Sequence, residues 1–126
     1  MIETDEVVTL HVPAQARYIR VARLVGAGLA NDLGLDLEGL DDVRLAIGEV
    51  CALATQLGAD FLDLRFVVDD RGLGVSGSGR TDGVADPVDE DHVRLVRQIL
   101  EVACSDHELT RDDRGLSFSL TFAHGS

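Results

Sequence analysis

The sequence predicts an α+β fold, a two-layer α/β sandwich in which helices cover one face of a mixed, mostly antiparallel sheet. Two observations support this prediction. Segments with helical spacing of apolar residues and segments with alternating apolar residues follow one another in the order β-α-α-β-β-α-β-β. Tight turns join two pairs of predicted strands, one pair on each side of the last helix, and such hairpins make antiparallel pairs. One helical layer over one sheet face buries the apolar surface of both.

The longest helical segment, Leu37 to Gly58, organises the chain. Its apolar residues line one face, and they are Leu40, Val43, Ile47, Val50, Ala54 and Leu57. Gly58 follows the last of them, as is common at a helix C-terminus. Glu49 interrupts the apolar half, and Leu53 follows it by four residues on the same stripe. These two positions bear directly on whether the chain handles a nucleotide.

A strand over residues 6–12 and a helix over about 14–33 are predicted before this segment, with Pro13 ending the strand. The apolar face of this first helix consists of Tyr18, Val21, Ala22, Val25, Leu29 and Leu33. Gly26 and Gly28 weaken the helix by about 1 kcal/mol each relative to alanine. Tertiary packing must therefore hold it in place.

After Gly58 the apolar spacing changes to alternation, which is typical of strands with one buried face. The elements expected here are a strand over 60–68, a turn over 69–72, a strand over 73–78, a loop over 77–91, a helix over about 89–104, a strand over 108–111, a turn over 112–115 and a strand over 116–122. In the last strand, apolar residues alternate with Ser and Thr, so we expect a polar outer face.

Length and charge limit the functions that the chain can have. A chain of 126 residues is expected to form one domain, over residues 1–126. It carries 23 Asp and Glu against 11 basic residues, all of them arginine, for a net charge of −12. This charge disfavours direct binding to nucleic acid or to an anionic membrane. The sequence has no signal peptide and no apolar run near the roughly 18 residues of a membrane span, so we expect a cytoplasmic protein.

Several other clusters have structural interpretations. Adjacent acids stand at a helix start and in hairpin turns, where Asp stabilises local structure; they are Asp41-Asp42, Asp69-Asp70 and Asp112-Asp113. Cys51 and Cys104 lack CxxC spacing and are expected to be small buried hydrophobes rather than a redox switch. The histidines lack the spacing of metal ligands, so no metal site is expected; they are His11, His92, His107 and His124.

The segment DDVRLAIGEVCALA, together with the order of elements, resembles the anti-sigma-factor serine-protein kinases of the GHKL (histidine-kinase-like) ATPase superfamily, particularly their short actinobacterial-type members. The likeness extends from VVTLHVPA through ARYIRVARLV to LVRQIL and LSFSLTF. It implies the Bergerat, or histidine-kinase-like ATPase, fold. It also implies a protein that inhibits a sigma factor by binding it. Typical members use ATP and Mg²⁺ to phosphorylate a serine of an anti-anti-sigma antagonist.

Three sequence boxes hold the nucleotide in a typical member of that family. The first pairs a general-base Glu with an Asn, four residues later, that helps to bind Mg²⁺. This sequence has Glu49 but places Leu53 where the Asn is expected. Because an isobutyl group has no lone pair, the metal loses its protein ligand.

The other two boxes depart further from the family pattern. In Asp-x-Gly-x-Gly, the Asp binds adenine; here Gly77 takes the Asp position and Thr81 that of the last glycine, unless Asp82-Gly83 supplies a shifted register. The third box is a glycine-rich turn that receives phosphate at the start of the last helix. Here that run is DEDH, with Glu90 and His92, and its carboxylates repel a polyphosphate.

The likeness and the departures together favour a binding module: a degenerate, pseudokinase-like member that binds a sigma factor and/or an anti-anti-sigma antagonist in a partner-switching system controlling transcription, with no cofactor. Arg23 matches an arginine that family members use at the partner interface, and Arg20, one turn earlier, is expected to join it. The alternative for Arg23 is a solvated arginine whose stem covers the helix.

Two other functions remain open. One is an active serine-protein kinase, with Glu49 as catalytic base and with ATP and Mg²⁺ bound in the shifted register. The other, which ranks lower, is an acidic decoy that competes with DNA for a basic protein surface. Homodimerisation is typical of the family, but the sequence shows no self-complementary patch.

Overall fold

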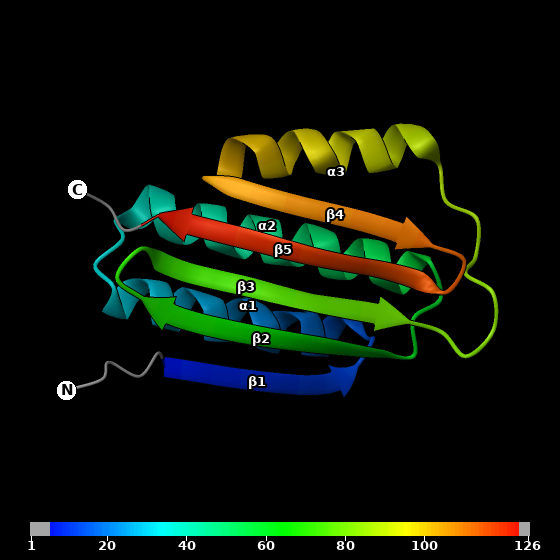
Figure 1. Ribbon diagram of the computed structural model, residues 1–126, viewed down its shortest axis with the longest axis horizontal. Coiled ribbons are helices and arrows are strands. Elements are labelled where there is room, and N and C mark those ends of the chain that lie inside the picture. Colours follow the sequence, from blue (N-terminus) through cyan, green and yellow to red (C-terminus); the bar gives the residue numbers. More distant parts are fainter. Residues whose placement is uncertain (1–5, 124–126) are drawn as a thin grey trace.

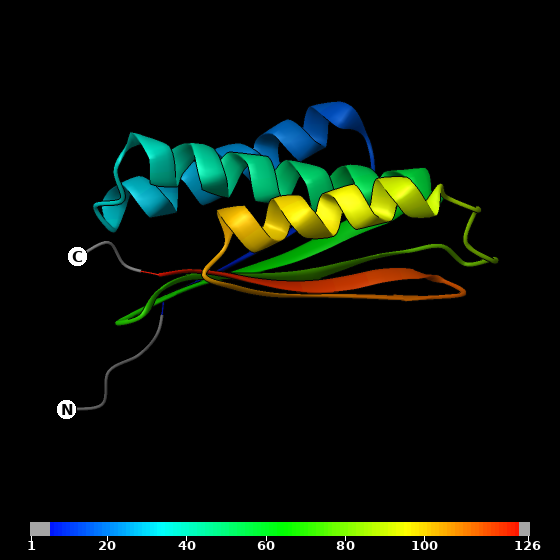
Figure 2. The ribbon, with the colours of Figure 1, turned by 90° about the horizontal axis from the view of Figure 1, so that it is seen from above.

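Five strands form one sheet in the computed structural model, which describes residues 6–123, and three helices lie on one face of this sheet (Figures 1 and 2). The strands are β1 (Glu6–Pro13), β2 (Phe61–Asp69), β3 (Gly72–Arg80), β4 (Asp106–Asp112) and β5 (Gly115–Ala123). The helices are α1 (Ala16–Asp32), α2 (Leu37–Gln56) and α3 (Glu90–Ala103). The predicted α+β sandwich and its order of elements are confirmed.

The strand order across the sheet is β1-β2-β3-β5-β4, and every neighbouring pair is antiparallel, so the sheet is not mixed. Both hairpin turns use Asp in the predicted way. Asp69 accepts a hydrogen bond from the backbone N–H of Arg71 (2.9 Å), and Asp112 accepts one from that of Arg114 (2.8 Å). Gly115, which follows, has φ of 142°, a conformation that favours glycine.

The core lies between the helices and the inner face of the sheet. The largest fully buried side chains are Phe66, Ile47, Leu53, Leu62, Leu73, Leu100, Leu116, Leu120, Val43, Val50, Val75 and Val96. On α1 the predicted apolar face is partly wrong, because Val21 is 38% exposed. Gly26 faces α2 instead, and a Cβ atom there would overlap with the side chain of Ile47. The glycine therefore allows the two helices to pack closely.

Several predicted boundaries shift. β1 includes Pro13, which an edge strand tolerates, and α1 begins at Ala16 with Gln15 as its N-cap. α2 is capped by Asp36, whose carboxylate accepts the backbone N–H of Gly39 at 2.9 Å. β4 begins at Asp106 rather than at residue 108. Within residues 6–123, none of the helices combines the length and the apolar character needed to cross a lipid bilayer.

Candidate functional site

The candidate nucleotide site centres on α2, where Glu49 and Leu53 are one turn apart. Their surroundings differ. Leu53 is 0% exposed and belongs to the hydrophobic core. Glu49 is half-buried and forms no ion pair with any other part of residues 6–123. A hydrocarbon side chain thus fills the core where the family pattern has a metal-binding amide, while the carboxylate remains accessible.

The end of β3 packs directly against α2, and its glycines make this possible. A Cβ atom at Gly79 would lie 2.6 Å from the Cβ atom of Ala54. A Cβ atom at Gly77 would overlap with the backbone carbonyl oxygen of Asp63 and would lie 3.0 Å from Cζ of Phe118. An aspartate at position 77 therefore does not fit unless the backbone moves.

The same contacts explain why the predicted start of the loop at Gly77 is wrong. Residues 77–80 belong to β3 and pair with β2 on one side and with β5 on the other. The run of Gly and Ser residues predicts a loop from the sequence, but in the structure these small residues allow β3 to pack closely against its neighbours. Because β3 ends at Arg80, Asp82 and Gly83 lie in an exposed part of the loop, and the longer strand that the shifted register needs is not formed.

Residues 81–89 connect β3 to α3, and backbone hydrogen bonds hold this loop. The N–H groups of Thr81 and Ala85 donate to carbonyl oxygens in the β4–β5 turn, at 2.8 and 2.7 Å. The N–H group of Asp86 donates to the carbonyl oxygen of Leu57, just after α2, at 2.9 Å. The loop is therefore tied both to the sheet and to the helix that carries Glu49.

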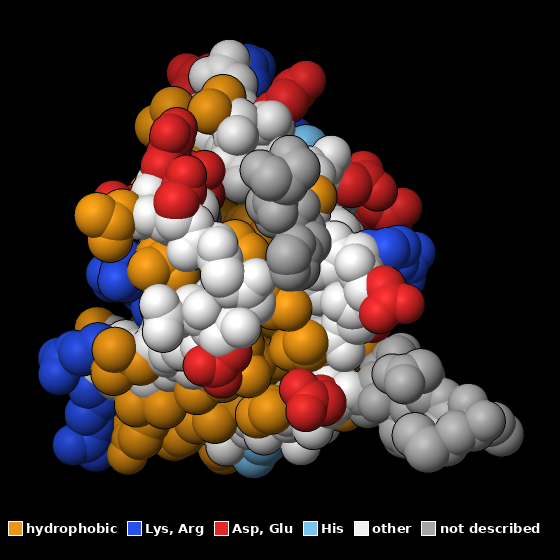
Figure 3. Space-filling model, turned by 90° about the vertical axis from the view of Figure 1, so that its left-hand side faces the viewer, with side chains coloured by type: hydrophobic (Ala, Val, Ile, Leu, Met, Phe, Trp, Pro, Cys, Tyr) orange, Lys and Arg blue, Asp and Glu red, His pale blue; other side chains and the backbone are white. Residues whose placement is uncertain are grey.

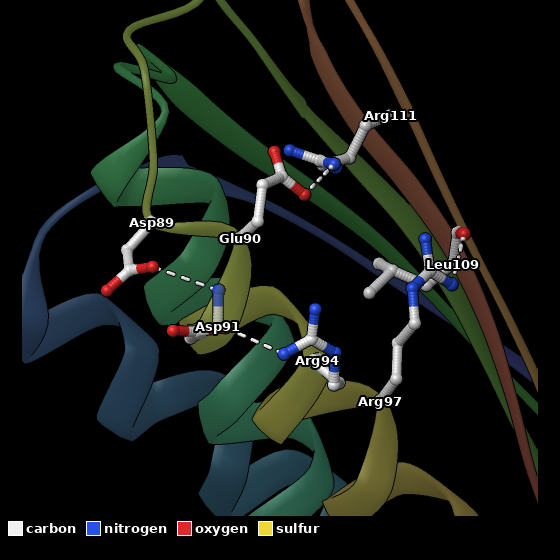
Figure 4. A network of polar contacts seen from close by, with 7 residues as sticks. All are labelled: Asp89, Glu90, Asp91, Arg94, Arg97, Leu109 and Arg111. Carbon is white, nitrogen blue, oxygen red and sulfur yellow. Dashed lines mark hydrogen bonds and ion pairs between the residues drawn. The ribbon is translucent and has the colours of Figure 1, made fainter.

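The start of α3 is built from carboxylates that have partners within the chain (Figure 4). Asp89 caps the helix by accepting the backbone N–H of Asp91 at 2.9 Å. Asp91 forms an ion pair with Arg94 at 2.7 Å, and Glu90 forms one with Arg111 of β4 at 2.8 Å. Carboxylates complement the positive end of the helix dipole. They therefore take the role that a phosphate has in the family pattern.

The positions that correspond to the family's nucleotide boxes lie on three elements, α2, β3 and α3. The end of β3 meets α2 where Gly79 packs against Ala54, next to Leu53 in the sequence, whereas Glu90 is exposed and His92 is half-buried in the first turn of α3. Among residues 6–123, no three His, Cys, Asp or Glu side chains are grouped so as to hold a metal ion. His124 lies outside the described residues.

The two cysteines are buried, as expected. Burial raises the pKa of Cys51 to about 12, and burial together with nearby acids raises that of Cys104 to about 12. Both thiols therefore stay protonated at neutral pH, and a protonated thiol is a poor nucleophile. Asp42, near the start of α2, has a pKa above its ordinary value because it is partly desolvated and lies close to other carboxylates.

The second candidate site is the outer face of α1. Arg20 and Arg23 are exposed, and Leu24 beside them is 63% exposed. The stem of Arg23 lies on α2, where a Cβ atom at Gly48 would be 3.3 Å from Cδ of Arg23. In the space-filling view, basic side chains border hydrophobic ones on the left, the side of the helices (Figure 3). The Arg23 stem thus covers α2 while its surroundings stay open to a partner.

Helix stability does not explain arginines at the start of α1. Arg17 and Arg20 stand in its first two turns, where the positive end of the helix dipole disfavours cations. The guanidinium of Arg17 lies over the ring of Tyr18, 4.8 Å from its centroid. In a chain with a net charge of −12, this half of α1 is a basic and partly apolar surface.

Comparisons with known proteins give partial matches. No protein-family model matches the chain. Over 56 residues, 44% of the chain, it is 36% identical to "Serine-protein kinase RsbW" from Bacillus thuringiensis (strain Al Hakam). The same identity and coverage are found with the proteins of that name from Bacillus mycoides (strain KBAB4) and Bacillus anthracis (strain CDC 684 / NRRL 3495). The matched region is 35% of each of these proteins, so the chain matches about a third of their length.

Proposed function

We propose that this chain is a cytoplasmic regulatory protein of the anti-sigma type, a degenerate member of the GHKL superfamily that works without ATP or Mg²⁺. It binds a sigma factor and/or an anti-anti-sigma antagonist in a partner-switching system that controls transcription. The partner class rests on the partial similarity to serine-protein kinases and on the family likeness of the sequence. The observation that carries the proposal is Leu53, which is fully buried where a metal ligand would be needed.

Three features support a chain that does not bind ATP. Leu53 offers no oxygen to Mg²⁺, which requires oxygen ligands. Gly77 has no room for the carboxylate that would recognise adenine. The start of α3 presents carboxylates of its own in place of a phosphate-binding turn. Restoring one of these features would leave the other two in place, so no single substitution is expected to create nucleotide binding.

The outer face of α1 supports a role in partner binding. Arginines and exposed aliphatic side chains together make the kind of surface at which hot spots occur. Because the chain has a net charge of −12, most of its surface repels an acidic partner. A local basic patch therefore determines where on the chain such a partner binds. We therefore assign Arg20 and Arg23 to the partner interface, with Leu24, one turn after Arg20, as the apolar contact.

Isothermal titration calorimetry with ATP and Mg²⁺ tests the first half of the proposal. We expect no saturable heat. A micromolar dissociation constant, about −8 kcal/mol of binding free energy, would overturn the nucleotide-free function.

Pull-down with candidate sigma factors and antagonists, followed by titration, tests the second half. Arg20→Ala and Arg23→Ala are each expected to weaken binding by about 1–2 kcal/mol, roughly tenfold. Arg71→Ala is the matched control, because Arg71 is exposed in the turn between β2 and β3. Equal affinities for all three variants would remove α1 from the interface.

The alternative function is an active serine-protein kinase. It is favoured by the accessible Glu49 and by the similarity to serine-protein kinases. A transfer assay with radiolabelled ATP and a candidate antagonist distinguishes the two functions. If the chain forms phosphoserine on the antagonist and the Glu49→Gln variant does not, the chain is a kinase. If no phosphate is transferred but the partner still binds, the chain is a binding module.

A further inference from the structure

A hollow of about 550 Å³ lies at the end of the molecule where α1 ends, α2 begins and α3 ends. This end is on the left in Figure 1, opposite the loop over residues 81–89, and it faces the viewer in Figure 3. The volume is within the range of about 300–1,000 Å³ that is usual for ligand sites. The proposed function does not use this hollow. Its lining includes Leu35, Asp36, Asp42, Val102, Ser105 and Phe122.

The two charged side chains of the lining are both acidic. Asp36 uses one carboxylate oxygen to cap α2, and Asp42 forms no ion pair with any residue of the range 6–123. Partial desolvation and the nearby carboxylates of Glu38, Asp41 and Asp36 raise the pKa of Asp42. Arg44 of α2 is paired with Asp41, at 2.7 Å. The hollow therefore carries negative charge that the described part of the chain does not neutralise.

Two helices end at this hollow and add to its negative potential. α1 ends just before Gly34 and Leu35, and the last residues of α3 belong to the lining. The C-terminus of a helix favours a cation, but neither α1 nor α3 has a basic residue in its last turn. The positive end of α2 is also here, and Asp36 and Glu38 already complement it. A positive group in the hollow is thus favoured by both carboxylates and by both helix ends.

The apolar part of the hollow continues onto an open rim. Val102 is the most exposed large hydrophobic side chain of residues 6–123, at 86%, and Leu37 is 79% exposed. The hydroxyl of Ser105 offers little to a ligand, because it already bonds to two backbone groups of β5. A small cation would contact the carboxylates but would leave the aliphatic rim uncovered. A polypeptide segment that carries both kinds of group covers both.

We propose that this hollow is a docking site for a segment of a partner protein in which an arginine or lysine side chain has aliphatic neighbours. The positive head of that side chain faces the carboxylates of Asp36 and Asp42, and its stem lies along the apolar lining. The aliphatic neighbours cover Val102 and Leu37. This inference does not depend on the proposed function, because the hollow lies about 20 Å from Arg20 along α1 and selects the opposite charge.

An NMR titration of the nitrogen-labelled chain with the peptide acetyl-Leu-Arg-Leu-amide tests the proposal. The ionic strength is kept at about 0.15 M, where charges more than about 8 Å apart are largely screened. We expect a dissociation constant of about 1 mM or tighter, with the largest amide shifts at Gly34, Gly39 and residues 102–104. The matched peptide acetyl-Leu-Glu-Leu-amide should not bind. Ethylguanidinium supplies the positive head alone and should bind at least about tenfold more weakly.

Three variants of the full chain locate the contacts. Asp42→Asn should raise the dissociation constant of the arginine peptide at least about fivefold, and Val102→Ser should raise it about threefold. Asp70→Asn removes the same charge from the exposed turn between β2 and β3 and should leave it unchanged. The proposal is overturned by amide shifts that do not saturate or that spread over the acidic surface, and by equal binding of the glutamate peptide or of ethylguanidinium. An unchanged affinity in Asp42→Asn overturns it as well.

Discussion

The seam between α2 and β3 and the outer face of α1 belong to the same helical layer but differ in what their side chains contact. In the seam, Gly79 packs against Ala54, and Leu53, the next residue towards the start of α2, is fully buried, so the contacts there are apolar. On α1, Arg20 and Leu24 are exposed. The proposed function assigns stability to the seam and partner binding to the surface, although the family likeness points to the seam as the functional centre.

The helix starts show the same division. α3 begins with Glu90 and Asp91, which complement the helix dipole, and both have arginine partners within the chain. α1 has no acidic residue in its first turn and carries Arg17 there instead. Carboxylates at the start of α3 stabilise that helix, whereas arginines at the start of α1 oppose its dipole. Stabilisation of the helix dipole therefore does not account for the arginines.

The largest expected effect comes from restoring the family residue in the seam. Leu53→Asn removes two methyl groups from a fully buried site and buries an amide that has no partner there. We expect a loss of about 3–5 kcal/mol in the free energy of unfolding, measured by urea denaturation. Leu45→Asn is the matched control on the same helix, because Leu45 is 46% exposed, and should change it by less than about 0.5 kcal/mol. A stable Leu53→Asn variant that binds Mg²⁺–ATP would refute the comparison.

A smaller loss is expected on the sheet side of the seam. Gly77→Asp sets a Cβ atom against the carbonyl oxygen of Asp63, so β3 must move away from β2. The expected loss is about 2–3 kcal/mol, the range of overpacked cores. At Gly74 on the same strand, the nearest atom to a new Cβ would be the carbonyl oxygen of Val67 at 3.9 Å. Gly74→Asp should therefore cost clearly less, and equal losses would show that the overlap at position 77 is relieved cheaply.

Much of the fold follows from periodicity in the sequence. The buried stripe of α2 and the alternation in β2 and β5 are strong patterns, and the hairpin turns carry Asp and Gly at the positions that such turns require. The glycines are harder to interpret. Gly26 and Gly79 permit close packing against α2. No local pattern distinguishes a glycine in such a contact from one in a loop, which is why β3 was predicted to end too early.

The candidate site was predictable to a different degree. Position 53 carries Leu where the family pattern has a metal-binding Asn. The sequence alone shows this difference, because a leucine side chain has no atom that can bind Mg²⁺. The partners of the carboxylates at the start of α3 were not predictable, since Glu90 pairs with Arg111 across a separate strand. The row that places Arg65, Ser76, Ser119 and Glu108 side by side likewise depends on the register of four strands, so it appears only in three dimensions.

The smallest expected effect concerns a carboxylate on the surface of α2. The pKa of Asp42 is raised by partial desolvation and by the nearby carboxylates of Glu38, Asp41 and Asp36. An acid whose pKa is higher in the folded than in the unfolded state destabilises the fold when it is ionised. This cost is fully present above the folded pKa and disappears as the pH falls below the unfolded value, near 3.8. Asp42→Asn should therefore stabilise the chain at pH 7 by a few tenths of a kcal/mol and have no effect in acid.

Asp112→Asn should show the opposite sign. Hydrogen bonds from the backbone N–H of Arg114 and from the side chain of Arg80 hold the pKa of Asp112 below its usual value. Its carboxylate stabilises the fold above the unfolded pKa, and that contribution is lost as the pH falls through the folded pKa. Thermal unfolding between pH 3 and 8, at constant ionic strength, measures both variants. A destabilising effect of Asp42→Asn at pH 7 would contradict this prediction. It would mean that the Asp42 carboxylate makes a favourable contact, and that polar groups on α2, and not only the apolar seam, contribute to the stability of the fold.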